Sequence, residues 1–321
     1  MISEFDLITK YFTRPSFKAD LGVGDDCALL KQTANLQTAI STDMLVSGTH
    51  FFPDTDPKQL GHKSLAVNLS DLAAMGATPV AFTLALSLPK SDENWIAPFA
   101  KGMLALADKY QCELIGGDTT RGPLNICITI FGQIPVGQSL QRHMAQPNDD
   151  IWISGTIGDA RLALAHMRKE LILPEQVFQQ VLPRMQQPMP RVELGTHLRN
   201  IAHAALDLSD GLLGDLSHIL DASHVGASIN TDNLPISSIL AQQSESWRFQ
   251  CTLGGGDDYE LCFTAPEEKR ALVIDAGIRT GIPVTRIGKI ESTPGIRLFN
   301  SNGPVNIGNI HSFDHFISSK K

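Results

Sequence analysis

The sequence predicts two α/β or α+β domains, and three observations support this prediction. The chain has 321 residues, which exceeds a typical single domain and is enough to bury two hydrophobic cores. Strand-like apolar runs alternate with segments of helical periodicity along its length. A polar stretch at 135–150, which contains Gly137 and Pro147, separates two such blocks. We therefore expect one domain over residues 1–136 and a second over residues 149–321.

Capping signals and hydrophobic periodicity predict the elements of each block in order. Asp56 before Pro57 is typical of a helix start, because the aspartate caps the helix and proline fits its first turn. Gly76 is expected to end this helix. The first block should contain a strand at 38–41, helices at 57–76 and 94–110, and paired strands at 112–115 and 125–132. The second should contain a strand at 151–154, a helix from Asp159, a proline-marked segment at 183–190, a strand, turn and helix centred on Asp207, and strands near Leu261 and Ile296.

The composition excludes several classes of function. The formal net charge is −8, and Lys and Arg do not cluster as they do in proteins that bind nucleic acid. The uncharged run 72–89 is interrupted by Gly76 and Pro79, which argues against a membrane span. The N-terminal residues include Glu4 and Asp6 and no cationic lead into an apolar run, so we expect a cytoplasmic protein without a secretory signal. An acidic protein can still bind polyphosphate when divalent cations lie between its carboxylates and the phosphates.

Aspartates beside Gly, Ser or Thr are the most unusual feature of the sequence. They stand at the predicted ends of elements, where the chain is exposed and the backbone can approach a ligand. Each motif alone also fits a solvated turn or a helix cap. In one cleft these carboxylates would repel one another unless divalent cations neutralised them, which implies a polyphosphate substrate. The aspartates are Asp25, Asp26, Asp43, Asp71, Asp118, Asp207, Asp210, Asp257 and Asp258.

Asp71 gives the strongest single indication of a functional carboxylate. Helical spacing puts it on one stripe with Leu60, Ser64 and Val67, in a helix apolar enough to be well buried. An unpaired carboxylate in such a place is costly. We therefore expect a cation or strong hydrogen-bond donors beside Asp71.

Three further motifs place hard oxygen donors or backbone N–H groups beside a carboxylate. Residues 41–43, Ser-Thr-Asp, follow a predicted strand and supply the oxygen ligands that Mg²⁺ accepts. The glycines of 116–122 could turn backbone N–H groups toward a phosphate while Asp118 holds a metal, and a hairpin loop is the alternative. Residues 207–212 place two aspartates beside a helix N-terminus, where free N–H groups can meet phosphate oxygens.

Seven motifs occur in order along nearly the whole chain: GDDC, STDMLVSGTHF, NLSDLAAMGATP, LIGGDTT, ISGTIGDA, DLSDGL and GGGDDYEL. In order and spacing they resemble the thiamine-monophosphate kinase family, which is related to aminoimidazole ribonucleotide synthetase and selenophosphate synthetase. The resemblance implies a two-domain synthetase-like fold, with an N-terminal mixed-sheet domain that dimerises through its sheet, a C-terminal α/β domain, and the site in the cleft between them. It also implies a homodimer that uses Mg²⁺ to transfer the γ-phosphate of ATP directly to thiamine monophosphate.

The resemblance assigns roles to individual residues as well. The Mg²⁺ ions would be held by Asp26, Ser41, Thr42, Asp43, Asp71, Asp118, Asp207 and Asp210. ATP would be contacted by Gly117, Asp118, Arg142 and Ser209, and thiamine monophosphate by His50, Asp257 and Phe313. The residues expected to act in catalysis are Asp71, Asp118, Arg142 and Asp210. The family often has Glu where this chain has Asp257, so the carboxylate of this chain is carried on a side chain one methylene shorter.

Two alternatives stay open. One is another ATP-dependent synthetase of the same superfamily. Selenophosphate synthetase would need a catalytic cysteine in its glycine-rich segment, where Cys27 follows GDD instead, and aminoimidazole ribonucleotide synthetase has a glycine run that STDMLVSG lacks. The other is a catalytically silent module that binds Mg²⁺ and nucleotide, for which we would expect lost carboxylates.

Overall fold

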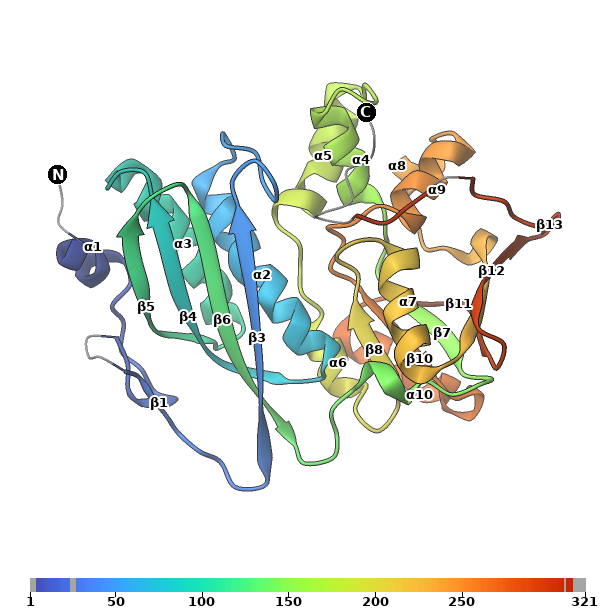
Figure 1. The fold of residues 1–321 in the computed structure, drawn as a ribbon, viewed down its shortest axis with the longest axis horizontal. Helices are drawn as coiled ribbons and strands as arrows, with labels where there is room; N and C mark the ends of the chain where they lie inside the picture. Colours follow the sequence, from blue (N-terminus) through green and yellow to red (C-terminus); the bar gives the residue numbers. More distant parts are fainter. Residues whose placement is uncertain (1–3, 24–26, 309, 314–321) are drawn as a thin grey trace. The chain divides into compact units, whose positions relative to one another are not determined.

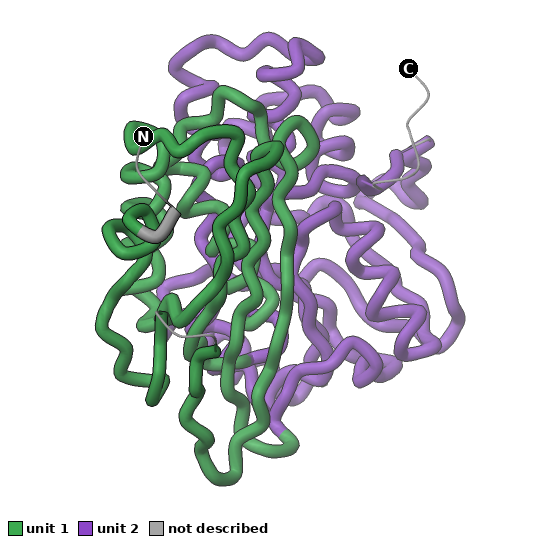
Figure 2. The backbone as a smooth tube through the Cα atoms, turned by 60° about the vertical axis from the view of Figure 1, so that its left-hand side comes forward, with its two compact units in different colours: residues 1–72, 77–137 green, residues 73–76, 138–321 purple. Residues whose placement is uncertain are grey.

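A computed structural model describes residues 4–23, 27–308 and 310–313 of the chain (Figure 1). Two compact units divide the chain (Figure 2). Unit 1 comprises residues 1–72 and 77–137, and unit 2 comprises residues 73–76 and 138–321. Among the described residues, no helix combines the length and the apolar character needed to cross a membrane.

Unit 1 is a four-stranded mixed sheet with two long helices on one face. The strand order is β3-β6-β4-β5, and β4 runs parallel to β5 and antiparallel to β6. Figure 1 shows α2 and α3 on the same side of this sheet. Glycine lets the two helices touch, since a Cβ at Gly61 would lie 2.0 Å from the carbonyl oxygen of Phe99. The elements are α1 (Glu4–Tyr11), β1 (Ala19–Leu21), β2 (Leu29–Leu30), β3 (Leu36–Val46), α2 (Pro57–Ala74), β4 (Thr78–Leu88), α3 (Glu93–Lys109), β5 (Glu113–Arg121) and β6 (Asn125–Pro135).

The predicted pairing of strands 112–115 and 125–132 is wrong, because β4 lies between β5 and β6. The helix α3 connects β4 to β5 as a parallel β-α-β unit, which needs a long crossover rather than a hairpin. The chain then returns along the other side of β4 to form β6. Most of segment 116–122 therefore continues β5 as far as Arg121, which also excludes the hairpin-loop alternative for this motif.

The first predicted helix is confirmed, together with its capping signals. It begins at Pro57, and the Asp56 carboxylate accepts a hydrogen bond from the Gln59 N–H at 3.0 Å. This bond satisfies one of the free N–H groups in the first turn. The helix ends at Ala74, and Gly76 follows it with a φ of 68°, a left-handed conformation that glycine adopts without strain.

Unit 2 contains a seven-stranded mixed sheet in the order β13-β12-β9-β11-β7-β10-β8. One core packs α7 on this sheet through residues such as Ile153 and Leu216, and a second core joins α4, α5 and α8 through Leu162, Val181 and Leu240. The strands and helices predicted for this block are confirmed as β7, α4, β8, α7, β10 and β12. The elements are β7 (Asp150–Ser154), α4 (Asp159–Met167), α5 (Glu175–Gln186), α6 (Val192–His197), β8 (Ala204–Asp207), α7 (Leu212–Ser223), β9 (Gly226–Asn230), α8 (Ser238–Ala241), α9 (Glu245–Leu253), β10 (Leu261–Ala265), α10 (Arg270–Thr280), β11 (Val284–Glu291), β12 (Gly295–Asn300) and β13 (Gly303–Pro304), with short 3-10 turns at Arg142–Met144, Thr231–Asn233 and Glu267–Lys269.

A buried carboxylate at the start of β7 makes the stability of unit 2 depend on pH. Asp150 is fully buried and accepts a hydrogen bond from Arg270 Nη2 at 2.9 Å. Burial acts to raise the pKa of Asp150, but the hydrogen bond and charge of Arg270, followed by the charges of Arg286 and Lys289, hold that pKa below its ordinary value. Such a carboxylate stabilises the folded state above the pKa of the unfolded chain, and this contribution is lost as the pH falls through the lower folded-state pKa.

We expect Asp150→Asn to lower the free energy of unfolding by about 2 kcal/mol at pH 7, because it removes the buried counter-charge of Arg270 and leaves that arginine only its exposed contact with Glu267, at 2.8 Å. The difference from the wild type should begin to shrink below about pH 4, where the carboxyl of the unfolded chain takes up a proton, and should vanish once the pH has fallen through the lower pKa of the folded state. Chemical denaturation at a series of pH values measures both quantities. A difference that stays constant from neutral to strongly acidic pH would contradict this account.

Candidate active site

The first part of the candidate site lies in unit 1, where β3 faces α2. Alternation along β3 directs Ser41, Asp43 and Leu45 to the same face of the strand. The Ser41 hydroxyl donates a hydrogen bond to Asp71 Oδ2 on α2. The Asp43 N–H donates to the Oδ1 atom of buried Asn68 at 3.2 Å. The structure therefore brings two predicted metal ligands, Ser41 and Asp71, into contact.

Asp71 itself is half-buried, whereas Leu60, Ser64 and Val67 on the same stripe of α2 are buried. The prediction that this stripe of α2 is buried is therefore confirmed for the residues beside Asp71. Asp71 itself is more exposed than the prediction required. A half-buried carboxylate keeps part of its hydration and stays accessible to a ligand. The hydroxyl of Ser41 is the strong donor that the sequence required beside it.

The side chain of Thr42 lies on the opposite face of the sheet from Ser41. Its hydroxyl is 2.9 Å from the hydroxyl of Thr129, which stands in register with it on β6. Successive side chains of a strand point to opposite faces. The Thr42 hydroxyl is therefore not brought together with Ser41 and Asp43. If Thr42 shares a cation with these two residues, the ligand is its main-chain carbonyl oxygen.

His50 follows β3 and folds back against its end. The Val46 N–H donates a hydrogen bond to His50 Nδ1 at 2.9 Å. An acceptor role at Nδ1 places the proton of the neutral ring on Nε2. An N–H group at Nε2 is therefore the group of the neutral ring that would face the anionic substrate predicted for His50.

Gly117 and Asp118 lie on β5, at the far side of the sheet from β3. Gly117 has a φ of 146°, and a Cβ there would lie 1.9 Å from the carbonyl oxygen of Leu84, so only glycine fits. Asp118 pairs with Ala85 of β4, which leaves β4 and β6 between Asp118 and Asp43. Three strand spacings amount to about 14 Å. Because Mg²⁺ binds oxygen at about 2.1 Å, Asp43 and Asp118 of one chain cannot hold the same ion.

The second part of the candidate site lies in unit 2, at the end of β8. Asp207 is the last residue of β8, and Ser209 Oγ donates to Asp210 Oδ2 at 3.2 Å in the turn that follows. The Asp257 N–H donates to the Ser209 carbonyl at 2.8 Å, and the Phe313 N–H donates to the Asp210 carbonyl at 3.1 Å. The structure thus brings together these predicted residues from three separate stretches of the sequence.

Asp215 is a buried member of this cluster that sequence reasoning missed. Its Oδ2 atom accepts hydrogen bonds from the N–H groups of Asp210 and Gly211, each at 3.0 Å. Burial raises the pKa of Asp215 to about 7. The backbone hydrogen bond from Asp210 acts to lower this pKa, and the charges of Asp210 and Asp207 act to raise it. Asp215 lies in the first turn of α7, where an acidic side chain stabilises the helix. This position is the sequence signal by which Asp215 could have been predicted as part of the cluster.

The two adjacent aspartates of the GGGDDYEL motif have different surroundings. Asp257 is half-buried and has a φ of 69°. Asp258 is 3% exposed, and both of its carboxylate oxygens accept the Gly158 N–H at 2.9 Å. Burial raises the pKa of Asp258 well above its ordinary value. Asp258 therefore holds the chain in place, and Asp257 is the more exposed of the two.

Arg142 is not brought together with Asp210. The Arg142 carbonyl accepts a hydrogen bond from the hydroxyl of Ser223, the last residue of α7, whereas Asp210 precedes the first residue of that helix. A helix of this length spans about 18 Å, more than an arginine side chain can reach. Arg142 and Asp210 of one chain therefore cannot contact the same atom of a ligand.

The described side chains fit Mg²⁺ that arrives with a polyphosphate. In the part of the chain that the structure describes, no three His, Cys, Asp or Glu side chains lie close enough to hold a metal by themselves. Mg²⁺ commonly takes one or two carboxylates and completes its shell with water and phosphate oxygens. Ser41 with Asp71, and Ser209 with Asp210, supply such small donor sets. Asp26, one of the eight predicted ligands, lies outside the described residues.

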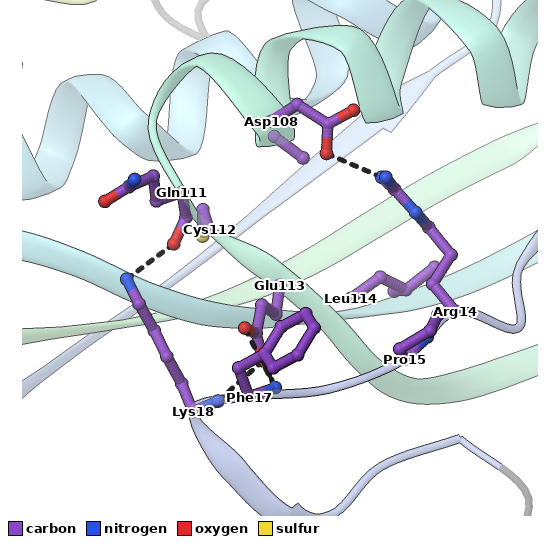
Figure 3. Close-up of a pocket in the computed structure, with 10 residues that line it drawn as sticks. Arg14, Pro15, Phe17, Lys18, Asp108, Gln111, Cys112, Glu113 and Leu114 are labelled. Carbon is purple, nitrogen blue, oxygen red and sulfur yellow. Dashed lines mark hydrogen bonds and ion pairs between the residues drawn. The ribbon is translucent and has the colours of Figure 1, made fainter.

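A cavity of about 520 Å³ in unit 1 is separate from all of these residues. It lies between the chain after α1 and the start of β5, and Figure 3 shows each of its charged groups bonded to another group of the protein. Arg14 lies 2.8 Å from Asp108, the Lys18 ammonium donates to the Gln111 carbonyl at 2.5 Å, and Glu113 accepts the Lys18 N–H at 3.0 Å. The cavity therefore offers little for an ionic substrate.

Comparison with known proteins gives the family. The AIR synthase related protein, N-terminal domain, matches residues 24–134, and the AIR synthase related protein, C-terminal domain, matches residues 146–300. The thiamine-monophosphate kinase of Salmonella typhimurium strain LT2 is 44% identical over 319 residues, which cover 98% of each chain. The chain belongs to the thiamine-monophosphate kinase family. The resemblance seen in the seven motifs is thereby confirmed.

Solved structures of the thiamine-monophosphate kinase family share the fold. The crystal structure of the enzyme from Stenotrophomonas maltophilia K279a is 47% identical with a TM-score of 0.83, and the match covers 88% of this chain and 91% of that one. AaThiL complexed with AMPPCP and TMP is 26% identical with a TM-score of 0.77, and the match covers 98% and 97% of the two chains. The predicted two-domain fold with mixed sheets is confirmed.

Proposed function

We propose that this chain transfers the γ-phosphate of ATP to thiamine monophosphate, with Mg²⁺, and releases thiamine diphosphate and ADP. The observation that carries the proposal is the 44% identity, over 98% of the chain, to a thiamine-monophosphate kinase. The complex of AaThiL with AMPPCP and TMP supports it, because that relative holds both ligands at once. The carboxylate and hydroxyl groups on β3 and at the end of β8 are the donors such a reaction needs.

We assign the residues of unit 1 to charge and metal. Ser41, Asp43 and Asp71 hold Mg²⁺ from the α2 side of the sheet, Thr42 contributes its carbonyl, and Asp118 with Gly117 meets the nucleotide from β5. Mg²⁺, when bound, neutralises the phosphates and the charge that develops during transfer. Asp26 is assigned to the same metal set. His50 donates from Nε2 to the phosphate of thiamine monophosphate.

We assign the residues of unit 2 to orientation of the two substrates. Asp207 and Asp210 hold Mg²⁺, Ser209 contacts ATP, and Asp257 and Phe313 contact thiamine monophosphate. Arg142 contacts ATP at a point remote from Asp210. The acceptor phosphate is already anionic, so the reaction needs no covalent nucleophile and little base catalysis, and rests on alignment and charge neutralisation.

Product analysis tests this function against its two rivals. ATP labelled in its γ-phosphate is incubated with Mg²⁺ and the protein, with and without thiamine monophosphate. We expect the label in thiamine diphosphate only when thiamine monophosphate is present. Label released without thiamine diphosphate would favour another synthetase of the superfamily, and bound but unreacted ATP would favour the silent module.

Phe313 offers a specific test of the thiamine assignment. Its side chain is 49% exposed, and its N–H is bonded to the Asp210 carbonyl. We expect Phe313→Ala to raise the KM for thiamine monophosphate about tenfold, the effect of losing about 1.4 kcal/mol of aromatic contact, and to leave the KM for ATP unchanged. Phe299→Ala is the matched control, since Phe299 is 39% exposed on β12. Equal effects of the two substitutions would rule out a thiamine contact at Phe313.

We further propose that the face of the unit 1 sheet opposite α2 and α3 forms a homodimer interface. Ile40 and Met44, which alternate with Ser41 and Asp43, are 63% and 53% exposed on that face. Large exposed apolar side chains that gather on one face are typical of an interaction surface. Asp118 is in register with Ala85, which belongs to the same face, so the interface would border a residue assigned to ATP.

We expect the double substitution Ile40→Asp with Met44→Asp to convert a dimer into a folded monomer and to lower phosphotransfer at least tenfold. Analytical ultracentrifugation measures the assembly, and circular dichroism measures the fold. The pair Ile274→Asp with Ile278→Asp, two exposed isoleucines of α10 in unit 2, is the control. A wild type that is monomeric while active would contradict the proposed interface.

A further inference from the structure

The segment Gly254–Glu260 has an unusual backbone that needs an explanation. Asp257 and Tyr259 have φ values of 69° and 50°, in the left-handed region. For residues other than glycine this conformation costs about 1–2 kcal/mol each. Two such residues so close together persist only when the surrounding structure holds them there. The residues that alternate with them, Asp258 and Glu260, are 3% and 0% exposed.

Glu260 is clamped by two arginines. Arg191 donates from Nε to Glu260 Oε2 at 2.6 Å and from Nη2 to Oε1, and Arg184 Nη2 donates to Oε1 at 2.8 Å. The Ser154 hydroxyl donates to Oε2 at 2.6 Å. A bidentate arginine fixes a carboxylate in direction as well as in position. Gly155 leaves the room for this clamp, because a Cβ there would lie 2.2 Å from Glu260 Oε1.

The two arginines that hold Glu260 lie within and directly after the proline-marked segment of the sequence, 183–190. Arg184 lies near the end of α5, next to Pro183, and Arg191 follows Pro190 just before α6. Arg184 Nη2 also donates to the Thr156 carbonyl at 2.9 Å, in the ISGTIGDA motif. Neither this segment nor Glu260 has a role in the assignments given for the reaction.

The backbone connects the clamp directly to the substrate groups. The Leu208 N–H donates to the Glu260 carbonyl, the Tyr259 N–H donates to the Leu208 carbonyl, and the Asp257 N–H donates to the Ser209 carbonyl, each at 2.8 Å. These three bonds join segment 208–209 to segment 257–260. The position of the Glu260 carboxylate therefore sets where both Asp257 and Ser209 lie.

We propose that Glu260, held by Arg184 and Arg191, is a positioning residue that presents Asp257 to thiamine monophosphate and Ser209 to ATP. The inference rests on the proposed function, because it takes those two contacts from it. Loosening the clamp lets the strained Asp257 backbone relax, so the substrates are bound less well although no contacting side chain has changed. Small displacements of this kind reduce catalysis strongly.

The test uses Arg191→Lys, because Glu260→Gln would remove the one buried carboxylate that both half-buried arginines contact and could unfold the unit. Lysine keeps the charge but cannot make the bidentate contact. Arg270→Lys is the matched control: Arg270 Nε and Nη2 hold the two oxygens of Asp150 in the same way, on a carboxylate that is also fully buried. Thermal melts, kcat and both KM values are measured for the two variants, and Arg184→Lys is measured as the milder change.

We expect both variants to lower Tm to a similar extent, and only Arg191→Lys to raise the KM for thiamine monophosphate, about tenfold, with a smaller rise in the KM for ATP. Arg184→Lys should change the same constants in the same direction. The inference would be overturned if Arg191→Lys and Arg184→Lys had the same kinetic constants as Arg270→Lys. The contacts of Glu260 with the two arginines would then contribute only to stability. Failure of the wild type to form thiamine diphosphate would instead overturn the proposed function, so the two failures are distinguishable.

Discussion

Asp71→Asn is expected to reduce phosphotransfer about a thousandfold, because it removes a negative charge from the group assigned to Mg²⁺ while keeping its size. The fold should survive. Asp71 is half-buried, and the asparagine oxygen can still accept the hydrogen bond from the Ser41 hydroxyl. The free energy of unfolding in the absence of ligand should change by about 1 kcal/mol or less. Steady-state kinetics and a thermal melt on the same sample separate activity from folding.

The same helix provides the control for Asp71→Asn. Asp56 caps α2 through its contact with the Gln59 N–H, and asparagine caps a helix about as well as aspartate. Asp56→Asn therefore removes one carboxylate charge from the helix and should leave both activity and stability near wild type. Near-normal turnover by Asp71→Asn, or its unfolding, would contradict the metal role given to Asp71.

Gly117→Ala is expected to destabilise unit 1 by about 3 kcal/mol or more. The new Cβ would lie 1.9 Å from the Leu84 carbonyl oxygen, and the φ of 146° is one that side-chain-bearing residues rarely adopt. Relief requires β5 to separate from β4, which would displace Asp118 and reduce phosphotransfer as well. Chemical denaturation gives the change in stability, and the product assay gives the change in activity.

Gly116→Ala is the matched substitution one residue earlier on β5. A Cβ at Gly116 would meet only the Thr83 Cγ2 atom, at 3.8 Å, which is an ordinary contact distance. Its effect on the free energy of unfolding should stay below about 1 kcal/mol. If the two alanine variants were equally stable, the close approach of β5 to the Leu84 carbonyl would not be a constraint on this strand.

Local signals in the sequence predicted much of the fold because they depend on neighbouring residues. The start of α2 at Pro57 follows from a cap and a first-turn proline, and its burial follows from the periodicity of its apolar residues. The pairing of β5 and β6 could not be predicted in this way. It depends on the crossover through α3, which places β4 between two strands that are neighbours in sequence.

The candidate site shows the same limit. Aspartates beside glycine or serine were visible as motifs, and so was the Ser-Thr-Asp run. Strand alternation then directs the Thr42 hydroxyl away from Ser41, and α7 separates Arg142 from Asp210. Conversely, the contact between Phe313 and Asp210 joins parts of the chain that no local pattern relates. Asp215 and Glu260 were missed because their roles come from burial and from partners distant in sequence.

The most direct test of the central claim is to mix the purified protein with ATP, Mg²⁺ and thiamine monophosphate and to follow the products by chromatography. We expect thiamine diphosphate and ADP to form in equal amounts, and a chelator that removes Mg²⁺ to stop both. ADP without thiamine diphosphate, or no turnover under conditions in which the protein is folded and binds nucleotide, would contradict the assignment of this chain as a thiamine-monophosphate kinase.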